Sequence, residues 1–419
     1  MDECIDGWLA GWLAGWLAGW LAGWLAGWLA GWLAELAGWL VANGETLRCA
    51  ETVEPLQPLN VTSRPLPEVP DEGVLLRTLY AGICRSDVHF IDDETKAGNN
   101  NGLGDSFKGA VLGHEICGIV DVIGKEVPAD CPLKVGYTVI VYPWRGCRQC
   151  EACSANESHL CENTAGGATD IGRGGEHVGG YSTHVAVPEW TLLVRVREAI
   201  PPQIACLLPC CGLTAFASIT KARPNLECAV RMRGRANLLV IGTGGVGTWT
   251  TLLVKCVFCD KNVNVICADV NAARLEEAAA LGADDVIEWD DAADVDEIVA
   301  TTTMGGYNKM DAVIDFVGTT RTQTAAFRSL HHGGAIVAVG LYGGQVALPV
   351  RSLVAKSVTL HGQRVGSVHV LRELVDLLSS QRPQKYPMVE YFGLDDINSA
   401  LDKLRKGDLK GRAVLQFST

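Results

Sequence analysis

The stretch Asn237-Leu-Leu-Val-Ile-Gly-Thr-Gly-Gly-Val-Gly247 decides the fold class of this chain. Its apolar run up to Ile241 predicts a buried strand, and the residues after Gly247 are typical of a helix. The glycines between them let the backbone approach a pyrophosphate, and the N-terminus of the following helix offers N–H donors and a positive dipole. A tight turn that binds nothing has the same glycine pattern, so the neighbouring sequence decides between the two.

The next predicted strand, Asn264-Val-Ile-Cys-Ala-Asp269, ends in a carboxylate 22 residues after Gly247. A carboxylate at this place accepts hydrogen bonds from the adenosine ribose hydroxyls and repels a 2′-phosphate, so the sequence favours NAD over NADP. The residues expected to bind NAD are therefore Gly242, Gly244, Gly245, Val246, Gly247 and Asp269.

Outside this stretch, the sequence shows two kinds of hydrophobic pattern, strand–helix alternation and short strand-like runs. A helix predicted at 272–281 and strands at 312–316 and 335–339 continue the strand–helix alternation, which indicates βαβ units and a parallel sheet. Before it, short apolar runs at 74–77, 116–122 and 137–141 are broken by Gly and Pro, as in an all-β unit. After it, two helices at 371–378 and 397–404 and a strand at 413–417 are expected.

Four cysteines form the pattern Cys147-x2-Cys150-x2-Cys153-x7-Cys161. Four thiolates within so short a loop can close a tetrahedral Zn²⁺ shell, and a closed shell is structural, not catalytic. Reduced or redox-active cysteines are the alternative, since C-x-x-C alone also fits a redox motif. The fourth cysteine favours zinc.

Three more motifs are spread along the chain: Cys84-Arg-Ser-Asp-Val-His89, Gly113-His-Glu115 and Leu208-Pro-Cys-Cys-Gly212. Taken separately, each has an ordinary explanation, because a single cysteine is most often a small buried hydrophobic residue. Their order along the chain, together with the glycine loop and the four cysteines, resembles that of the zinc-containing medium-chain alcohol dehydrogenases. The resemblance runs from about Glu45 to Thr419.

This resemblance implies an α/β fold in which a GroES-like, β-rich catalytic domain accompanies a doubly wound Rossmann parallel sheet. It assigns residues 45–210 and 365–419 to the catalytic zinc domain and residues 211–364 to the NAD-binding domain. It also implies two Zn²⁺ ions per chain and a homodimer or homotetramer assembled through the nucleotide domains.

The same resemblance implies roles for single residues. Cys84, His114 and Cys210 would ligate the catalytic zinc and leave one position for a substrate oxygen. Cys210 matches the family ligand because it directly precedes the x-Gly-x-Thr segment, and Cys211 is the second choice. Glu115 is similar to the glutamate behind the metal, and Asp87 to the carboxylate that orients the histidine ligand.

Four further residues match positions of that family. Ser86 and His89 are similar to a relay that carries the alcohol proton to the surface, although His89 also fits an ordinary exposed histidine. Arg85 and Arg412 match positions that contact the cofactor pyrophosphate, and a plain surface charge is the alternative for each. The implied reaction is reversible hydride transfer between a primary or secondary alcohol and NAD.

Some features depart from the family pattern. Gly136-Tyr137 stands where Gly-Asp is common, and the interval between Cys84 and His114 is expanded by a polar segment that is expected to be exposed. Trp144 fits a wall of the substrate pocket and fits plain packing equally well. The shared motifs do not separate a simple alcohol dehydrogenase from a polyol, butanediol or threonine dehydrogenase, or from a catalytically retired relative that still binds NAD and zinc.

Composition limits the other classes of function. The chain has 419 residues and a formal charge of −13, which argues against a nucleic-acid partner. Sixteen cysteines in a chain of this length suggest metal ligands in a reducing compartment, and hence the cytoplasm. The partner that the resemblance implies is a small-molecule alcohol or carbonyl compound.

Residues 1–44 stand apart, because Gly-Trp-Leu-Ala recurs seven times from Gly7 to Ala34. These 28 uncharged residues are long enough to span a bilayer as a helix. However, the flank before them is acidic, and a four-residue repeat spirals around a helix instead of forming one face. We expect a low-complexity extension with no role in the chemistry. Membrane or partner association, or absence from the mature protein, are the alternatives.

Overall fold

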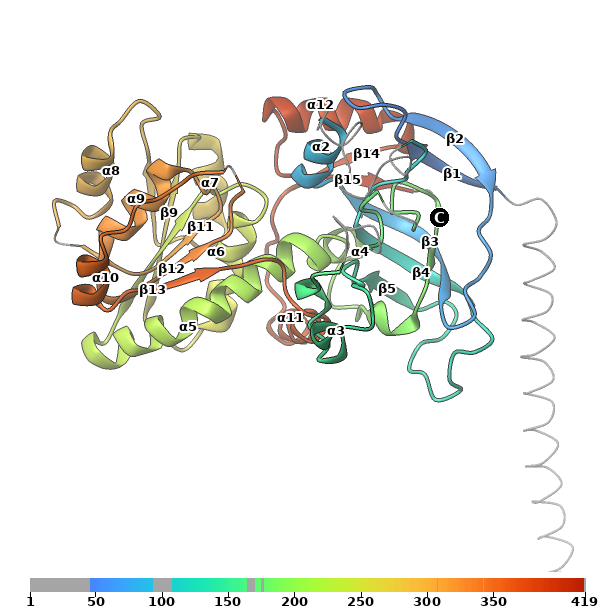
Figure 1. Cartoon of the computed structure of the whole chain (residues 1–419), viewed down its shortest axis with the longest axis horizontal. Coiled ribbons are helices and arrows are strands. Elements are labelled where there is room, and N and C mark those ends of the chain that lie inside the picture. Colours follow the sequence, from blue (N-terminus) through green and yellow to red (C-terminus); the bar gives the residue numbers. More distant parts are fainter. Residues whose placement is uncertain are drawn as a thin grey trace, which may run out of the picture.

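The computed structural model describes residues 46–92, 108–163, 170–174, 177–306, 308–341 and 343–417. Two lobes, each built around its own sheet, lie side by side, and the chain enters and leaves through the same lobe (Figure 1). The repeat at 1–44 and most of the polar segment between Cys84 and His114 fall outside the described residues. The predictions made for them are therefore not addressed.

The first lobe contains a six-stranded sheet in which every neighbouring pair is parallel. Its strand order is β10-β9-β8-β11-β12-β13. The strands are β8 (Ala236–Ile241), β9 (Val263–Asp269), β10 (Asp285–Glu288), β11 (Met310–Asp315), β12 (Leu330–Ala338) and β13 (Thr359–Gly362). The strand order reverses between β8 and β11, and ligands of open α/β sheets bind at such a point. The predicted doubly wound parallel sheet is thus confirmed.

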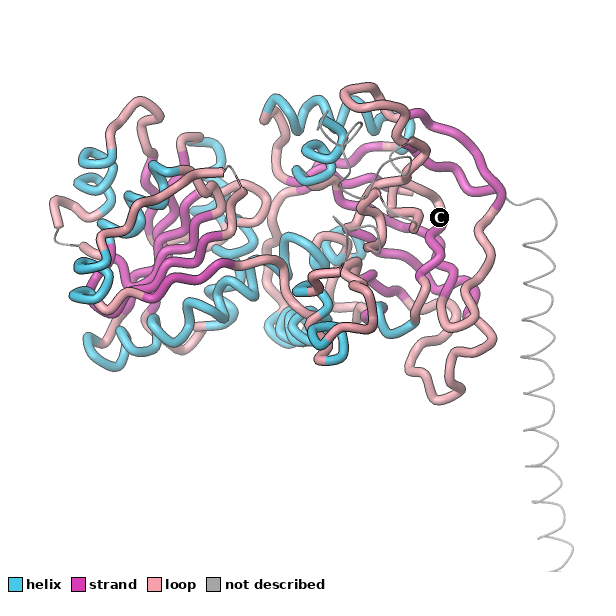
Figure 2. The backbone as a smooth tube through the Cα atoms, viewed as in Figure 1, coloured by secondary structure: helices cyan, strands magenta, loops and turns pink. Residues whose placement is uncertain are grey.

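Helices cover both faces of this sheet (Figure 2). Leu238 and Val240 of β8 belong to the apolar core that includes helices α5 and α6, whereas Leu239 and Ile241 belong to the core on the side of α9. Because both faces of the sheet are buried here, the sequence of β8 contains a continuous run of apolar residues. The helices of this lobe are α5 (Leu213–Arg233), α6 (Gly247–Val257), α7 (Ala272–Ala280), α8 (Val295–Thr302), α9 (Thr320–Ser329) and α10 (Val350–Lys356).

The second lobe contains a seven-strand sheet whose strands come from both ends of the described chain. Its order is β14-β15-β3-β4-β5-β7, and β6 pairs with β3. The strands are β3 (Val74–Gly82), β4 (Glu115–Ile123), β5 (Thr138–Val141), β6 (His184–Val187), β7 (Leu193–Arg195), β14 (Val389–Phe392) and β15 (Arg412–Gln416). The predicted β-rich unit is therefore confirmed, and a strand from beyond residue 410 completes it.

The remaining elements of this lobe are short or lie at its edges. Strands β1 (Thr46–Glu51) and β2 (Asn60–Pro65) form a separate antiparallel pair. The helices are α2 (Arg85–Asp92), α3 (Glu151–Ser154), α4 (Pro202–Ala205), α11 (Val368–Gln381) and α12 (Ile397–Lys406). The short turns are η3 (Ser158–Leu160), η5 (Trp190–Leu192), η6 (Leu208–Gly212) and η7 (Leu394–Asp396).

Two further observations concern the helices of the described residues. Within the part that the structure describes, no helix is both long and apolar enough to cross a membrane. The expected helices near 371–378 and 397–404 correspond to α11 and α12, each slightly longer than expected. The domain boundaries at 210/211 and 364/365 stay predictions.

Candidate active site

Four side chains from three distant segments meet in the second lobe. Cys84 lies between β3 and α2, His114 and Glu115 lie at the start of β4, and Cys210 lies in η6. Their possible ligand atoms all lie within 4.8 Å of one another, and we call this group the catalytic cluster. The Sγ atoms of Cys84 and Cys210 are 3.9 Å apart, and Nε2 of His114 is 3.3 Å from Sγ of Cys210.

Antiparallel pairing of β3 and β4 brings the first two segments together. Gly82, the last residue of β3, lies opposite Glu115, the first residue of β4. A Cβ atom at Gly82 would collide with the carboxylate of Glu115, so this place requires glycine. The sheet register therefore carries Cys84 to the side of His114, although 29 residues separate them in the sequence.

The adjacent cysteines of η6 point in different directions. Cys210 faces the cluster, while the Cys211 thiol donates to the carbonyl oxygen of Leu207 at 3.1 Å and is fully buried in the apolar core. The segment forms a single π-helical turn, a feature that is often found at functional sites. The geometry agrees with the choice of Cys210 over Cys211.

A layer of hydrogen bonds fixes His114 from behind. Nδ1 of His114 lies 3.1 Å from Oδ1 of Asp87, so Nε2 is the nitrogen turned toward the thiols. The other carboxylate oxygen of Asp87 accepts from the Tyr181 hydroxyl at 2.8 Å and from the Cys84 backbone N–H at 3.0 Å. Sequence reasoning missed Tyr181, because nothing in its local pattern separates it from a core aromatic residue.

Glu115, a member of the cluster, forms a buried ion pair with Arg412. Burial raises the pKa of Glu115 to about 7, although the charge of Arg412 opposes that rise. The Oε1 atom of Glu115 is buried and has no hydrogen-bond partner. A hydrogen bond from Cys210, followed by His114 and the Arg412 charge, lowers the pKa of the Cys84 thiol well below its usual range despite burial. The cluster therefore favours a thiolate at Cys84.

The surroundings of the cluster include two polar side chains and a tryptophan. The Ser86 hydroxyl donates to Sγ of Cys84 at 3.3 Å and accepts from Nη1 of Arg173 at 3.0 Å. The buried Trp144 ring lies 5.7 Å from the His114 ring, between centroids, and its Nε1–H donates to the Pro209 carbonyl at 3.4 Å. Trp144 thus packs against His114 of the catalytic cluster and against Pro209, the neighbour of Cys210. Arg173 carried no signal in the sequence.

His89 and Arg85 lie on the exposed side of α2. Nη1 of Arg85 donates to the Leu404 carbonyl of α12 at 2.7 Å. This contact ties α2 to α12. The roles expected of Arg85 in cofactor binding and of His89 in proton release stay predictions.

The second cysteine group, Cys147, Cys150, Cys153 and Cys161, is compact. The Cys147 backbone N–H donates to Sγ of Cys161 at 3.3 Å, and the sulfurs of Cys150 and Cys161 are 3.7 Å apart. Hydrogen bonds, led by the backbone N–H of Gln149, lower the pKa of Cys147 to about 6. Gly146 has φ +69°, and a Cβ there would lie 2.6 Å from Sγ of Cys153.

The glycine loop connects β8 to α6 as expected. Gly242 has φ +84°, and a Cβ at Gly247 would collide with the carbonyl oxygen of Gly242, so the turn needs both glycines. Asp269 at the end of β9 accepts from the backbone N–H and the hydroxyl of Thr243, at 2.7 and 3.1 Å. A Cβ at Gly245 would lie 2.5 Å from Cδ of Arg412, so this arginine lies between the loop and the catalytic cluster.

Both cysteine-containing groups fit zinc. Thiolate and imidazole donors are the ligands that zinc prefers, and four thiolates close a tetrahedral shell. In the catalytic cluster Glu115 is itself a potential ligand, and its Oε1 is a buried carboxylate oxygen without a hydrogen-bond partner. Two thiols and one imidazole leave a coordination position open, as in catalytic zinc sites.

Comparisons with known proteins agree with this geometry. Residues 70–198 match the family model described as alcohol dehydrogenase GroES-like domain, and residues 245–380 match that of zinc-binding dehydrogenase. The chain is 30% identical to an NAD-dependent alcohol dehydrogenase of Sulfurisphaera tokodaii over 377 residues, which cover 88% of this chain and 99% of the relative. It is 29% identical to a D-arabinose 1-dehydrogenase (NADP⁺) of Saccharolobus solfataricus, covering 86% and 94%.

A solved alcohol dehydrogenase from Aeropyrum pernix superposes with a TM-score of 0.71 at 26% identity, over 88% of this chain and all of the other. The fold and its cysteine and histidine donors thus define a zinc-binding dehydrogenase with a GroES-like domain. The chain belongs to the zinc-containing medium-chain alcohol dehydrogenase family. It is an enzyme of the oxidoreductase class.

Proposed function

We propose that this enzyme interconverts an alcohol and its carbonyl compound, with NAD as hydride acceptor and donor. The observation that carries the proposal is the placement of the catalytic cluster beside the glycine loop, with Arg412 between them. Bound zinc supplies a Lewis acid that lowers the pKa of a coordinated alcohol, and bound NAD supplies the hydride acceptor.

Cys84, His114 and Cys210 would hold the catalytic zinc. Asp87 orients the imidazole through Nδ1, and Tyr181 in turn orients Asp87. Glu115 lies behind the ligands, where its ion pair with Arg412 balances its charge. Cys147, Cys150, Cys153 and Cys161 would hold the structural zinc.

The alcohol proton needs a path out of the buried site. The Oγ atom of Ser86 is within 3.3 Å of a proposed zinc ligand, so its hydroxyl is placed to accept a proton from a bound alcohol. His89 lies on the same helix, α2, and is exposed to solvent. We assign Ser86 to the start of this path and His89 to its exposed end.

NAD would bind at the carboxyl end of β8. The backbone of Gly242, Gly244, Gly245, Val246 and Gly247, with the N-terminus of α6, would hold the pyrophosphate, assisted by Arg85 and Arg412. Asp269 would accept hydrogen bonds from the adenosine ribose. Because its buried carboxylate would repel a 2′-phosphate, we expect NAD to be preferred over NADP.

The test follows absorbance at 340 nm with the full-length, zinc-loaded protein, NAD or NADP, and a panel of primary, secondary, aromatic and polyol alcohols. Formation of NADH that disappears in His114→Ala supports the proposal and begins to define the substrate. Preference for NADP would overturn the role of Asp269. Protein that holds two zinc ions and NADH but turns over nothing in the panel would instead fit a retired relative.

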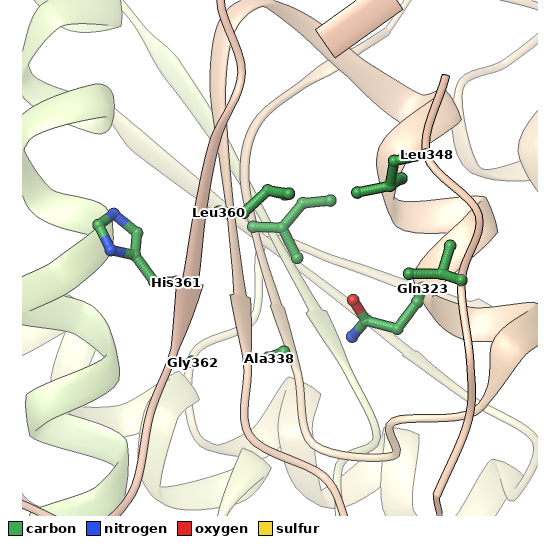
Figure 3. A pocket seen from close by; sticks show the side chains of 8 residues that line it. Gln323, Ala338, Leu348, Leu360, His361 and Gly362 are labelled. Atoms are coloured by element: carbon green, nitrogen blue, oxygen red, sulfur yellow. The ribbon is translucent and has the colours of Figure 1, made fainter. Parts of the chain in front are cut away.

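A homodimer or homotetramer formed through the first lobe, which contains the six-stranded sheet and the glycine loop, is also part of this proposal. Strand β13 forms one edge of the six-stranded sheet. Beside it, Leu360, Val350, Val354 and Leu341 are exposed by 43%, 71%, 73% and 92%. A cavity of about 250 Å³ lies next to this edge, lined by Leu348, Leu360 and His361 among others (Figure 3). Sedimentation of the wild type and of Val354→Glu tests whether this surface joins two copies.

We place the enzyme in the cytoplasm because its described cysteines form no disulfide. None of the fifteen cysteines in the described ranges forms a disulfide, including the seven in the two proposed metal-binding groups and η6. A reducing compartment keeps thiolates available for zinc. Detection of the protein in the cytosolic fraction of its source cells tests this placement.

A further inference from the structure

Two arginines whose charges act on Asp170 have no carboxylate partner within the described residues, and one of them, Arg173, contacts neighbours of the catalytic cluster. Arg173 lies in the short segment 170–174, and Arg364 lies between β13 and α11. Arg173 is half-buried and Arg364 is exposed. The chain as a whole is acidic, so two cations without a carboxylate partner among the described residues are a local feature and not a general property of the surface.

Side chains of the site hold Arg173 in place. Its Nη1 donates to Oγ of Ser86 at 3.0 Å, and its Cζ lies 5.1 Å from the centroid of the Trp144 ring. Ser86 contacts Cys84, and Trp144 lies beside His114. The guanidinium is therefore one side chain away from two proposed zinc ligands, and it has N–H donors beyond the one that Ser86 accepts.

Arg364 lies in the connection between β13 and α11, close enough to Asp170 for its charge to act on that carboxyl. The Tyr142 hydroxyl donates to the Gly366 carbonyl at 2.9 Å, which holds the segment of Arg364 against the end of β5. Burial raises the pKa of the Asp170 carboxyl, and the charges of Arg173 and Arg364 both oppose that rise. Both guanidinium groups thus lie within electrostatic range of Asp170.

Asp170 is a negative charge within electrostatic range of both arginines, but it is already engaged. It is buried, and its carboxyl accepts hydrogen bonds from the backbone N–H groups of Arg145 and Gly146. Neither arginine approaches it as a salt bridge. The planar guanidinium group matches the oxygens of a carboxylate or phosphate, and a partly buried one is more stable with such a partner.

We propose that Arg173, with Arg364, binds an anionic group of the substrate, so that the preferred alcohol or carbonyl compound carries a carboxylate or a phosphate ester. This inference rests on the proposed function and specifies its substrate class. The anionic group lies near Trp144, and the reacting carbon lies at the open position of the catalytic cluster. A separation of a few bonds between the two groups is therefore expected.

The test compares matched aldehydes as substrates for reduction by NADH. One pair is succinic semialdehyde and butanal, and the other is glyceraldehyde 3-phosphate and glyceraldehyde. In the wild type, we expect kcat/KM to be higher for the anionic member by about tenfold or more. Arg173→Gln should lower the anionic-to-neutral ratio by roughly 10- to 100-fold, mainly through KM, and Arg364→Gln should lower it less. If the anionic-to-neutral ratio of kcat/KM is higher for the first pair, the anionic group of the substrate is a carboxylate. If it is higher for the second pair, that group is a phosphate.

Arg235→Gln is the matched control, because Arg235 is exposed at the start of β8 and remote from the cluster. It should leave the ratio unchanged. A second measurement does not depend on turnover: calorimetric titration of the NADH-bound holoenzyme with succinate and with methyl phosphate. Binding that weakens in Arg173→Gln but not in Arg235→Gln supports the anion site.

The outcomes separate this inference from the proposed function. Turnover of neutral aldehydes with equal ratios in all variants, and no anion binding, overturns the anion site and leaves the dehydrogenase function intact. Arginine-dependent binding of succinate without turnover of any aldehyde overturns the proposed function and keeps the anion site. A ratio that falls equally in Arg235→Gln also overturns the assignment.

Discussion

Two groups of potential zinc ligands lie in the same lobe, and they are built in different ways. The four cysteines from Cys147 to Cys161 come from one loop, whereas the catalytic cluster takes Cys84, His114 and Cys210 from three segments. All four cysteines of the loop are close together in the sequence, so their spacing alone indicates a metal site. The catalytic cluster exists only because the β3–β4 register and the η6 turn bring its members together.

The two groups also differ in what surrounds them. Buried polar groups support the catalytic cluster: Asp87, held by Tyr181, lies behind His114, and Arg412 pairs with Glu115. The four-cysteine loop relies mainly on its own backbone N–H groups. A site that must hold a substrate at an open position needs outside support to keep that position open. A closed shell needs only its ligands.

The largest expected effect comes from removing a ligand of the catalytic cluster. Cys84→Ala should reduce kcat/KM by at least about 10³-fold, because the Lewis acid is lost with its ligand. Zinc per chain, measured by atomic emission, should fall from two to one, and the thermal unfolding temperature should change little. Two retained zinc ions with lost activity would contradict the assignment of Cys84.

Removing a ligand of the four-cysteine loop should act on stability instead. We expect Cys153→Ala to lower the thermal unfolding temperature by at least about 8 °C, because a structural metal contributes directly to folding. Calorimetry with and without a chelator measures this shift. Activity lost to the degree of Cys84→Ala, in protein that is still folded and holds one zinc, would break the comparison between the two groups.

A smaller effect is expected from the support behind His114. Asp87→Asn keeps the shape of the side chain but removes the charge that orients the imidazole. It should therefore lower zinc affinity or kcat/KM by roughly 10- to 100-fold. Competition with a chromogenic chelator measures the affinity. If both quantities stay at the wild-type level, the orienting role of Asp87 is wrong.

The smallest effect is expected at Cys211, next to a proposed ligand. Because its thiol donates to Leu207 and lies in the apolar core, Cys211→Ala should change kcat/KM by no more than about threefold. Cys210→Ala is the matched comparison and should behave like Cys84→Ala. Equal losses in the two variants would show that both cysteines of η6 serve the cluster.

Much of the fold was predictable from sequence. The strand before Gly242 and the carboxylate at Asp269 follow local rules of apolar periodicity and glycine turns, and the structure has β8, the loop, α6 and β9 as expected. Less predictable were the helix α2 and the pairing of β15, a strand expected at 413–417, with β3 of the second sheet. Strand pairing between chain ends leaves no local periodicity, so only the resemblance to a family suggested it.

The sequence by itself determined the parallel sheet, the nucleotide-binding loop and the four-cysteine loop, because each depends on residues that are neighbours in the chain. The tertiary structure decided which of Cys210 and Cys211 faces the catalytic cluster, that Tyr181 supports Asp87, and that Arg173 stacks on Trp144. These contacts depend on the direction of side chains from separate segments. That direction is set by sheet register and packing, which the linear order of residues does not display.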